Sequence, residues 1–258
     1  MIRIKDYEEL KVRIVNWLKD YYWKYDIKAF VVGVSGGIDS AVVSTLCAET
    51  ELPTYVLTMP LDSKKENTRL SDAHAKALDD KYPNVTHYNI DLSHSYSTLI
   101  SAIGTQTCPE GFTHNRELIT NELANANTKS RLRMVTLYQI AGSVGGIVVG
   151  TGNKVEDYGI GFYTKYGDGG VDIAPIADLY KTEVRELGGY LGVMDEIIDA
   201  PPTDGLWDDG RSDEDQIGAT YPELEEAMEN GTGKAVDILY KFNRQNRHKM
   251  EPIPTFKL

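Results

Sequence analysis

The sequence predicts an α/β protein in which a doubly wound parallel sheet carries flanking helices, followed by a helical C-terminal portion. Two observations predict this class. Short apolar runs rich in β-branched residues alternate with longer amphipathic stretches, and such alternation favours parallel strands joined by right-handed crossovers. A glycine-rich loop also connects the first predicted strand to a helix. Because no repeat or change of composition marks a linker, we expect a single domain over residues 1–258.

The elements are expected in the following order. Asp6 and Glu9 form a capping-box start for a helix that runs to about residue 24. Strands are expected at 29–32, 54–59, 85–90 and 145–150, and further helices at 41–49, 68–81, 115–143, 182–191, 223–229 and 234–246. Polar loops are expected at 61–67, 101–115 and 201–215, and the glycine and proline content of 104–111 and 203–215 suits lids.

Composition narrows the function classes. The formal net charge is −12 and the isoelectric point is near 4.9, which argues against general nucleic-acid binding because such surfaces are basic. The two cysteines, Cys47 and Cys108, are too few for a disulfide framework and lack metal-ligand spacing. The N-terminal stretch has no signal-peptide pattern, and no apolar window reaches the length of a membrane span. We therefore expect a cytoplasmic enzyme with neither a nucleic acid nor a membrane as partner.

The stretch Gly33-Val34-Ser35-Gly36-Gly37-Ile38-Asp39-Ser40 is the strongest functional signal. Its glycines permit positive φ and a close backbone approach, so that the loop amides and the following helix N-terminus face one spot suited to a phosphate. Ser35 and Ser40 add hydroxyl donors. A carboxylate repels a phosphate unless a cation lies between them, and Asp39 is therefore interpreted as a Mg²⁺ ligand. The alternative is an ordinary strand-to-helix turn.

Two other phosphate-binding loops do not match. A Walker A loop requires Gly-Lys before Ser or Thr, a dinucleotide loop requires Gly-x-Gly-x-x-Gly, and neither pattern occurs. In a parallel sheet, ligands bind beyond the carboxyl ends of the strands. Thr151 and Glu156 follow the predicted strand 145–150 and belong to that edge, where Thr151 is a nucleotide contact and Glu156 a second metal ligand. For Glu156, a charge at a helix N-terminus is the alternative.

Further segments carry groups suited to anions. Arg131 and Arg133 stand two apart on a predicted helix, so that one can bind a ligand while the other forms a structural ion pair; two solvated arginines are the alternative. The segment 162–172 combines charged, aromatic and glycine residues that a plain surface loop seldom combines. Lys181 precedes a helix and is either a phosphate donor or a solvated lysine. The cluster Arg247-His248-Lys249 is, as a bare charge run, more often solvent-exposed.

The order of the motifs is specific. Ser-Gly-Gly-Ile-Asp-Ser is followed by Asn-Thr-Lys-Ser-Arg-Leu-Arg-Met, Gly-Thr-Gly-Asn-Lys-Val-Glu, Phe-Tyr-Thr-Lys-Tyr-Gly-Asp-Gly-Gly-Val-Asp, Pro-Pro-Thr-Asp-Gly-Leu and a terminal His-Lys. Over nearly the whole chain this set resembles the bacterial and archaeal NAD⁺ synthetases, a family of the ATP pyrophosphatase superfamily with an adenine nucleotide alpha hydrolase-like fold. The run Lys-Tyr-Gly-Asp-Gly-Gly separates that family from GMP synthetase, asparagine synthetase and the tRNA-thiolating enzymes.

The resemblance implies an ATP-dependent ligase that amidates deamido-NAD⁺ with ammonia. The nicotinate carboxylate attacks the α-phosphorus of ATP and pyrophosphate leaves; ammonia then converts the adenylate into NAD⁺ and AMP. Such a transfer needs positioning and charge neutralisation rather than a protein nucleophile, and no Ser-His-Asp or Cys-His set is evident in the sequence.

The site residues implied by the resemblance carry over by motif. ATP would contact Gly33, Val34, Ser35, Gly36, Gly37, Ile38, Asp39, Ser40, Thr151, Lys181 and Thr203. Deamido-NAD⁺ would contact Arg131, Lys165, Asp172, His248 and Lys249. Mg²⁺ would be held by Asp39 and Glu156, and the catalytic set would be Asp39, Glu156, Asp172 and Lys181. Asp172 is expected near either the cationic pyridinium or the incoming ammonia.

The chain departs from the family pattern at one point and lacks one known extension. The Arg and Gln found near the adenine in many relatives are absent from Met59-Pro60-Leu61-Asp62-Ser63-Lys64, so adenine recognition is unassigned. There is no room before residue 29 for a glutaminase (amidase) domain, and free ammonia or a donor protein is expected. The family also implies a homodimer. The alternatives are another ATP pyrophosphatase with a different acceptor, or a non-catalytic ATP-binding module, which would need the glycine loop but neither Glu156 nor the segment 165–172.

Overall fold

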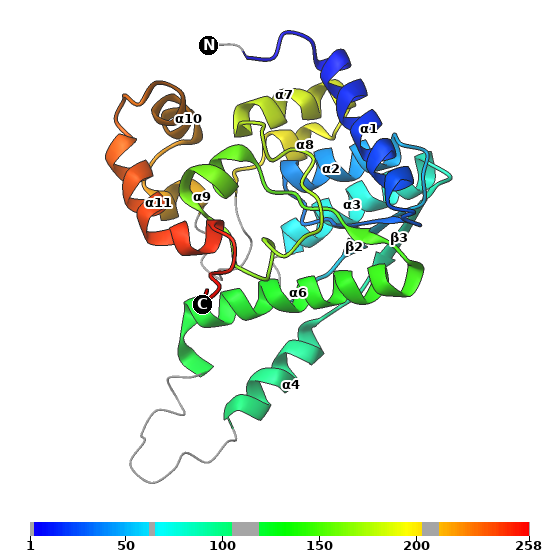
Figure 1. Cartoon of the computed structure of the whole chain (residues 1–258). Coiled ribbons are helices and arrows are strands. Elements are labelled where there is room, and N and C mark those ends of the chain that lie inside the picture. Colours follow the sequence, from blue (N-terminus) through cyan, green and yellow to red (C-terminus); the bar gives the residue numbers. More distant parts are fainter. Residues whose placement is uncertain (1–2, 62–64, 105–118, 203–211, 258) are drawn as a thin grey trace.

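A four-stranded parallel sheet with the strand order β3-β2-β1-β4 forms the centre of the fold (Figure 1). The computed structural model describes residues 3–61, 65–104, 119–202 and 212–257. The strands are β1 (Phe30–Gly33), β2 (Thr54–Thr58), β3 (Val85–Asn89) and β4 (Ile147–Val148). In the register, Phe30 of β1 lies opposite Thr54 of β2 on one side and Ile147 of β4 on the other.

Helices surround the sheet. They are α1 (Tyr7–Lys24), α2 (Ile38–Ala48), α3 (Lys65–Lys81), α4 (Ser93–Gly104), α6 (Glu122–Val144), α7 (Lys181–Leu191), α8 (Asp195–Ile198), α9 (Asp213–Ile217), α10 (Tyr221–Asn230) and α11 (Val236–Met250), with a π-helix η1 (Val155–Ile160) after β4. Asp6 caps α1, because its Oδ1 accepts a 3.0 Å hydrogen bond from the Glu9 amide, which is one half of the predicted capping box. No helix in the described ranges is both long enough and apolar enough to cross a membrane.

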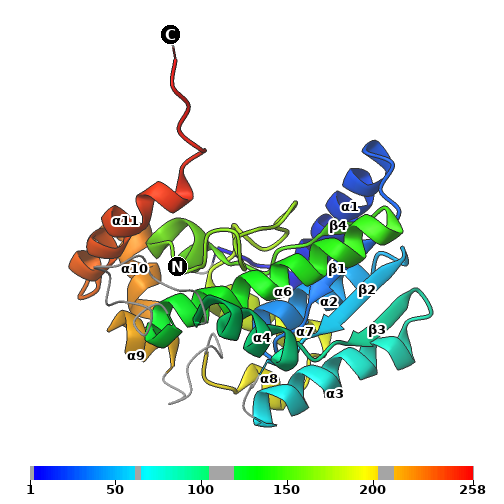
Figure 2. The same cartoon turned by 90° about the horizontal axis from the view of Figure 1, so that it is seen from below.

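Alternate residues of β1 enter apolar cores on opposite faces of the sheet. Phe30 and Val32 pack in the core formed with α1, α2, α7 and α8. Val31, between them, packs in the core that includes Ala141 of α6. Figure 2 shows α6 crossing one side of the sheet and α2 and α3 lying on the other. Burial on both faces explains why β1 is a continuous apolar run, and the doubly wound arrangement confirms the predicted fold class.

The C-terminal helices form a cluster of their own beside the sheet. Tyr221, Leu224 and Ala227 of α10 pack against Val155 and Ile160 of η1, with partly buried apolar residues of α11 around them. This cluster, at the orange and red end of Figure 1, confirms the predicted helical C-terminal portion. It also attaches η1, and with it the end of β4, to the last third of the chain.

The outer side of β4 is covered by the segment around Asp172. The amide of Val148 donates a 2.7 Å hydrogen bond to Oδ2 of Asp172, and the Asp172 amide donates a 3.0 Å bond to the Val148 carbonyl. One residue further on, Val149 and Ile173 form a parallel bridge. The edge strand β4 therefore has its outward backbone groups paired although it is two residues long.

Several predicted boundaries were wrong. Helix α4 occupies residues expected to be loop at 101–104, and it buries none of its residues, so it has no buried apolar face to predict it. Helix α3 begins at Lys65, inside the predicted loop 61–67. The predicted loop 201–215 contains the start of α9, which begins after a Ser212 cap. The helix predicted over 115–143 is helical at 119–120 and continues as α6 after an Asn121 cap, and the part at 115–118 lies outside the described residues. The other parts of the predicted loops and lids, at 62–64, 105–118 and 203–211, lie outside the described residues.

Candidate active site

The glycine loop folds back on its own hydroxyl groups between β1 and α2. Gly36 has φ +91°, which a side chain would disfavour. The Ser40 hydroxyl accepts from the Ser35 amide at 3.1 Å and donates to the Gly37 carbonyl at 3.0 Å, and the Ser35 hydroxyl accepts from the Gly37 amide at 3.2 Å. Helix α2 begins at Ile38 without a side-chain cap. Its first amides are therefore available to an anion.

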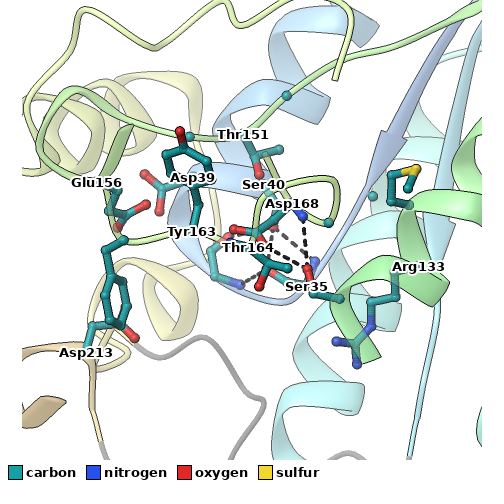
Figure 3. A pocket seen from close by; sticks show the side chains of 18 of the residues that line it. Ser35, Asp39, Ser40, Arg133, Thr151, Glu156, Tyr163, Thr164, Asp168 and Asp213 are labelled. Atoms are coloured by element: carbon teal, nitrogen blue, oxygen red, sulfur yellow. Dashed lines mark hydrogen bonds between the residues drawn. The ribbon is translucent and has the colours of Figure 1, made fainter. Parts of the chain in front are cut away.

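A buried lysine connects two carboxylates next to this loop. The Lys181 ammonium group donates to Asp39 Oδ2 and, at 3.0 Å, to Glu156 Oε1. Asn153 holds the other oxygen of Asp39 at 3.2 Å. Tyr221 donates a 2.6 Å bond to Glu156 Oε1. The three charged groups come from α2, η1 and α7, and in Figure 3 Asp39 and Glu156 lie side by side on the same wall.

Burial and charge act against each other in this cluster. Burial alone would lower the pKa of Lys181, but the carboxylates of Asp39 and Glu156 raise that pKa above its ordinary value. For Glu156, burial raises the pKa, and the ammonium of Lys181 with the Tyr221 hydroxyl lowers it below its ordinary value. We therefore treat Lys181 as charged and Glu156 as ionised near neutral pH.

A cavity of about 820 Å³ opens in front of the cluster. It is lined by the whole loop from Gly33 to Ser40 and by Thr151, Glu156 and Lys181. Of the residues predicted to bind ATP, only Thr203 cannot be placed, because it lies outside the described residues. Arg133 also lines the cavity, on the α6 side opposite Glu156 in Figure 3, and its Nε donates to the Met59 carbonyl at 3.2 Å.

Four of the residues predicted to bind deamido-NAD⁺ line the same cavity, namely Arg131, Lys165, His248 and Lys249. Lys249 Nζ donates 2.7 Å hydrogen bonds to the carbonyls of Gly161 and Tyr163. Lys165 Nζ donates to the His248 carbonyl at 3.3 Å, and Arg131 Nε donates to the Lys165 carbonyl at 3.2 Å. These contacts join α6, α11 and the segment between them into one basic wall.

Asp172 does not join this group. Its Oδ2 accepts from the Val148 amide and its Oδ1 accepts from the Tyr138 hydroxyl at 3.0 Å. The neighbouring Val171 lines the cavity, whereas Asp172 does not. The structure thus gives Asp172 a role at the edge of β4, outside the cavity wall.

Sequence reasoning overlooked a group of polar residues that shapes the loop at the cavity wall. Asp168 Oδ1 accepts from the Ser130 hydroxyl at 2.7 Å and from the Thr164 amide at 3.1 Å, and the Ser130 hydroxyl in turn accepts from the Asp168 amide at 2.9 Å. Figure 3 shows Asp168 and Thr164 close to each other at the cavity wall. A Cβ on Gly167 would lie 2.2 Å from the Ser130 hydroxyl oxygen, so glycine is required there. A conspicuous Asp-Gly-Gly run was the only sequence signal for this arrangement.

Two acidic residues of the wall were also overlooked. Asp157 lines the cavity against Gly152, and burial, followed by the charges of Glu156 and Asp168, raises its pKa to about 7. Asp213, at the start of α9, lies 3.4 Å from the Tyr221 hydroxyl. No sequence spacing connects Asp213 with Glu156, because α9 and η1 are far apart in the chain.

The side chains of this site can be assessed as ligands for a metal cation. In the described residues, no group of three or more His, Cys, Asp or Glu side chains could hold a metal by itself. Asp39 and Glu156 nevertheless lie within hydrogen-bonding distance of one nitrogen, that of Lys181. Mg²⁺ is commonly held by one or two carboxylates together with substrate phosphates, and this pair beside a phosphate-type loop fits that pattern.

A family model and a relative found by sequence point to the same family. The NAD synthase family model matches residues 10–253. An NH(3)-dependent NAD(+) synthetase of Carboxydothermus hydrogenoformans is 38% identical over 247 residues, which cover 95% of each chain.

Solved structures of similar proteins have the same fold. An NMN synthetase from Francisella tularensis superposes with a TM-score of 0.85 at 33% identity and covers 99% of this chain and 100% of its own. An NH3-dependent NAD synthetase from Campylobacter jejuni has a TM-score of 0.73 at 22% identity, with 98% and 100% of the two chains covered, and supports the fold alone.

Proposed function

The chain belongs to the NAD synthase family, and we propose that it makes NAD⁺ by amidating deamido-NAD⁺ with ammonia at the expense of ATP. The nicotinate carboxylate attacks the α-phosphorus of ATP, the bond to the bridging oxygen breaks, and pyrophosphate leaves with the electron pair. Ammonia then attacks the adenylated carboxyl carbon, AMP leaves, and one proton is lost. The products are NAD⁺, AMP and pyrophosphate.

One observation carries this proposal. The Lys181 ammonium group lies between Asp39 and Glu156 beside the uncapped start of α2, in a cavity of about 820 Å³. The loop amides are proposed to hold the phosphates, and Lys181 to place a positive charge near the reacting phosphorus. Thr151 and Thr203 are proposed as further ATP contacts. Fixed charges and amides of this kind stabilise developing charge without rearranging during the reaction.

Magnesium is proposed as the metal, with Asp39 and Glu156 as its protein ligands. When bound with ATP, it would neutralise phosphate charge and so favour departure of pyrophosphate. Its arrival would compete with Lys181 for the same two carboxylates. We infer that the lysine then turns toward the phosphates, because its ammonium no longer needs to offset both acids.

The second substrate is proposed to lie along the wall formed by Arg131, Lys165, His248 and Lys249. This wall shares one cavity with the glycine loop, so a nicotinate carboxylate held there can approach the phosphates. Asp172 remains a proposed contact and catalytic residue. Because it stands outside the cavity lining, it requires a substrate that extends past Val171.

A single synthetase domain that uses ammonia directly is also proposed. The match to 95% of the length of the Carboxydothermus relative, whose name specifies NH(3), supports it. A cytoplasmic homodimer is proposed as well. The apolar side chains of Leu123 and Val135 on α6 are exposed, as an interface would require, and sedimentation of the purified chain tests the oligomeric state.

Product analysis tests the reaction. Purified protein is incubated with ATP, Mg²⁺, deamido-NAD⁺ and ammonium, and each component is omitted in turn. Equal amounts of NAD⁺, AMP and pyrophosphate, formed only in the complete mixture, are expected. AMP and pyrophosphate without NAD⁺ would show that the acceptor is wrong, and ATP that is bound but unchanged would favour a non-catalytic module.

One observation favours a second candidate substrate. The Francisella tularensis structure, which is 33% identical, is an NMN synthetase. The same chemistry applied to nicotinate mononucleotide would give NMN, because this molecule has the same carboxylate and lacks the adenylate half of deamido-NAD⁺. Direct competition of the two acceptors in one reaction mixture decides which has the higher kcat/KM.

A further inference from the structure

Arg185 lines the cavity one helical turn beyond Lys181. The two side chains are four residues apart on α7 and therefore lie on the same face of the helix. The Nε atom of Arg185 is buried and has no hydrogen-bond partner in the described part of the chain. An arginine stays charged at any ordinary pH, so this buried guanidinium nitrogen is costly to leave unpaired.

The packing of α7 on α2 locates Arg185 relative to the glycine loop. Lys181 contacts Asp39, the second residue of α2. Two turns later, a Cβ on Gly188 would lie 2.6 Å from Ile38, the first residue of α2. Arg185 lies between these two contact points on α7 and thus flanks the uncapped start of α2. Backbone amides at such a helix start attract phosphate.

Among the described residues, the other Lys and Arg side chains of the wall each donate at least one hydrogen bond to a protein group, whereas the Nε of Arg185 donates none. Lys181 is offset by two carboxylates, and Arg131, Arg133, Lys165 and Lys249 donate to backbone carbonyls. Asp157 and Asp213 add further acidic groups to the same lining. A polyphosphate that enters the cavity is repelled by these carboxylates, so it needs positive charge beyond that of Lys181. Arg185 supplies a positive charge, and its unpaired Nε supplies a hydrogen-bond donor for a phosphate oxygen.

We propose that Arg185 binds the terminal phosphates of ATP and, after the α-phosphorus is attacked, the pyrophosphate leaving group. The proposal rests on the proposed function only in taking ATP as the substrate that releases pyrophosphate. A guanidinium forms paired hydrogen bonds with phosphate oxygens. These bonds strengthen as charge develops on the departing bridging oxygen, so Arg185 lowers the barrier to adenylation as well as holding ATP.

Direct binding of inorganic magnesium pyrophosphate tests the proposal without any acceptor. Calorimetry is performed on the full chain and on Arg185→Gln and Arg185→Lys, with AMP as a second titrant. We expect Arg185→Gln to weaken pyrophosphate binding roughly 10- to 100-fold, the value of a lost charge-assisted bond, and Arg185→Lys to weaken it less. AMP binding should change less than about twofold.

Arg69→Gln is the matched control, because Arg69 pairs with the exposed Glu196 and does not line the cavity. Its pyrophosphate affinity should equal that of the unmodified chain. Thermal unfolding of every variant reports the fold, and if Arg185→Gln does not fold, Arg185→Lys decides the question. Unchanged pyrophosphate affinity in a folded Arg185 variant, or an equal loss for AMP, overturns the proposal.

The two proposals fail separately. Pyrophosphate binding that depends on Arg185, in a protein that forms no NAD⁺ in the omission experiment, would retain the phosphate role and remove the proposed reaction. If the unmodified chain forms NAD⁺ but Arg185→Gln binds pyrophosphate as tightly as the unmodified chain, the proposed reaction is retained and the phosphate role of Arg185 is removed.

Discussion

The Tyr221 hydroxyl donates a 2.6 Å hydrogen bond to the same Glu156 oxygen that accepts from Lys181. Tyr221 is the first residue of α10 and is 2% exposed, so its ring is part of the C-terminal core. The position of a proposed metal ligand is therefore fixed by a helix that contributes no residue to the cavity lining.

Tyr221→Phe should raise the Mg²⁺ concentration needed for half-maximal activity several-fold. The ring keeps its place in the core, and the loss of one hydrogen bond costs about 1 kcal/mol. Magnesium titrations of NAD⁺ formation measure the effect, with Tyr240→Phe as control because Tyr240 is exposed. An unchanged magnesium dependence would show that Tyr221 does not position Glu156.

Asp39→Asn should lower kcat by roughly 100-fold or more, because it removes a proposed metal ligand and a partner of Lys181. Initial rates at saturating ATP and ordinary Mg²⁺ measure the loss. Asp178→Asn is the control, since Asp178 is an exposed acid that pairs with Lys154. A kcat like that of the unmodified chain in Asp39→Asn would remove Asp39 as an essential ligand.

Lys249→Ala should raise KM for deamido-NAD⁺ by about tenfold while KM for ATP changes less than about twofold. Lys249 stands on the basic wall, and its two carbonyl partners belong to the segment after η1 rather than to the glycine loop. Steady-state kinetics with each substrate varied give the two constants. Lys241→Ala, at an exposed position of the same helix, is the control, and equal effects on both substrates would contradict the assignment.

His74 should make stability depend on pH. Its Nε2 lies 3.0 Å from the Ser44 hydroxyl, and burial lowers its pKa from 6.5 to about 4. The unfolded chain therefore binds more protons than the folded chain between these values, and stability falls as pH drops through that window. From about pH 7.5 to about pH 5 the loss from this residue is about 2 kcal/mol.

Urea unfolding of the unmodified chain and of His74→Gln at both pH values isolates this contribution. Glutamine does not titrate, so the variant should lose about 2 kcal/mol less on acidification. Identical losses in the two proteins would mean that His74 takes up its proton in the folded state.

Gly188 and Gly189 should respond oppositely to alanine. A Cβ on Gly188 would meet Ile38 at 2.6 Å and Val42 at 3.3 Å, whereas a Cβ on Gly189 meets nothing within 4 Å. We expect Gly189→Ala to stabilise the protein by about 0.5–1 kcal/mol and Gly188→Ala to destabilise it by about 1–3 kcal/mol. Thermal unfolding measures both, and equal shifts would contradict the packing of α7 on α2.

The sequence was most informative where the determining residues are neighbours. The glycine loop, its preceding strand and the following helix are contiguous, so their roles can be predicted from local chemistry. The Asp6 cap of α1 was predictable for the same reason. The bridge from Lys181 to Asp39 was not, because it depends on how two helices pack across a separation of 142 residues.

Other elements of the structure cannot be recognised from the spacing of apolar residues in the sequence. Helix α4 buries no residue, so nothing marks its apolar face. The π-helix η1 has a wider turn than the period used to recognise helices, and it places Glu156 and Asp157 next to the cavity. Asp172 illustrates the converse, because a motif suggested substrate chemistry while the structure shows its carboxylate bound to a strand amide.

That carboxylate has a consequence for the behaviour of the protein at high concentration. An open edge strand invites a strand of another molecule to join the sheet, which leads to aggregation. At β4 the outward amide of Val148 is already occupied by Asp172, which brings a negative charge to the position that an incoming backbone would need. Asp172 and the bridge at Ile173 thus end the sheet at this side and protect the folded chain from edge-to-edge self-association.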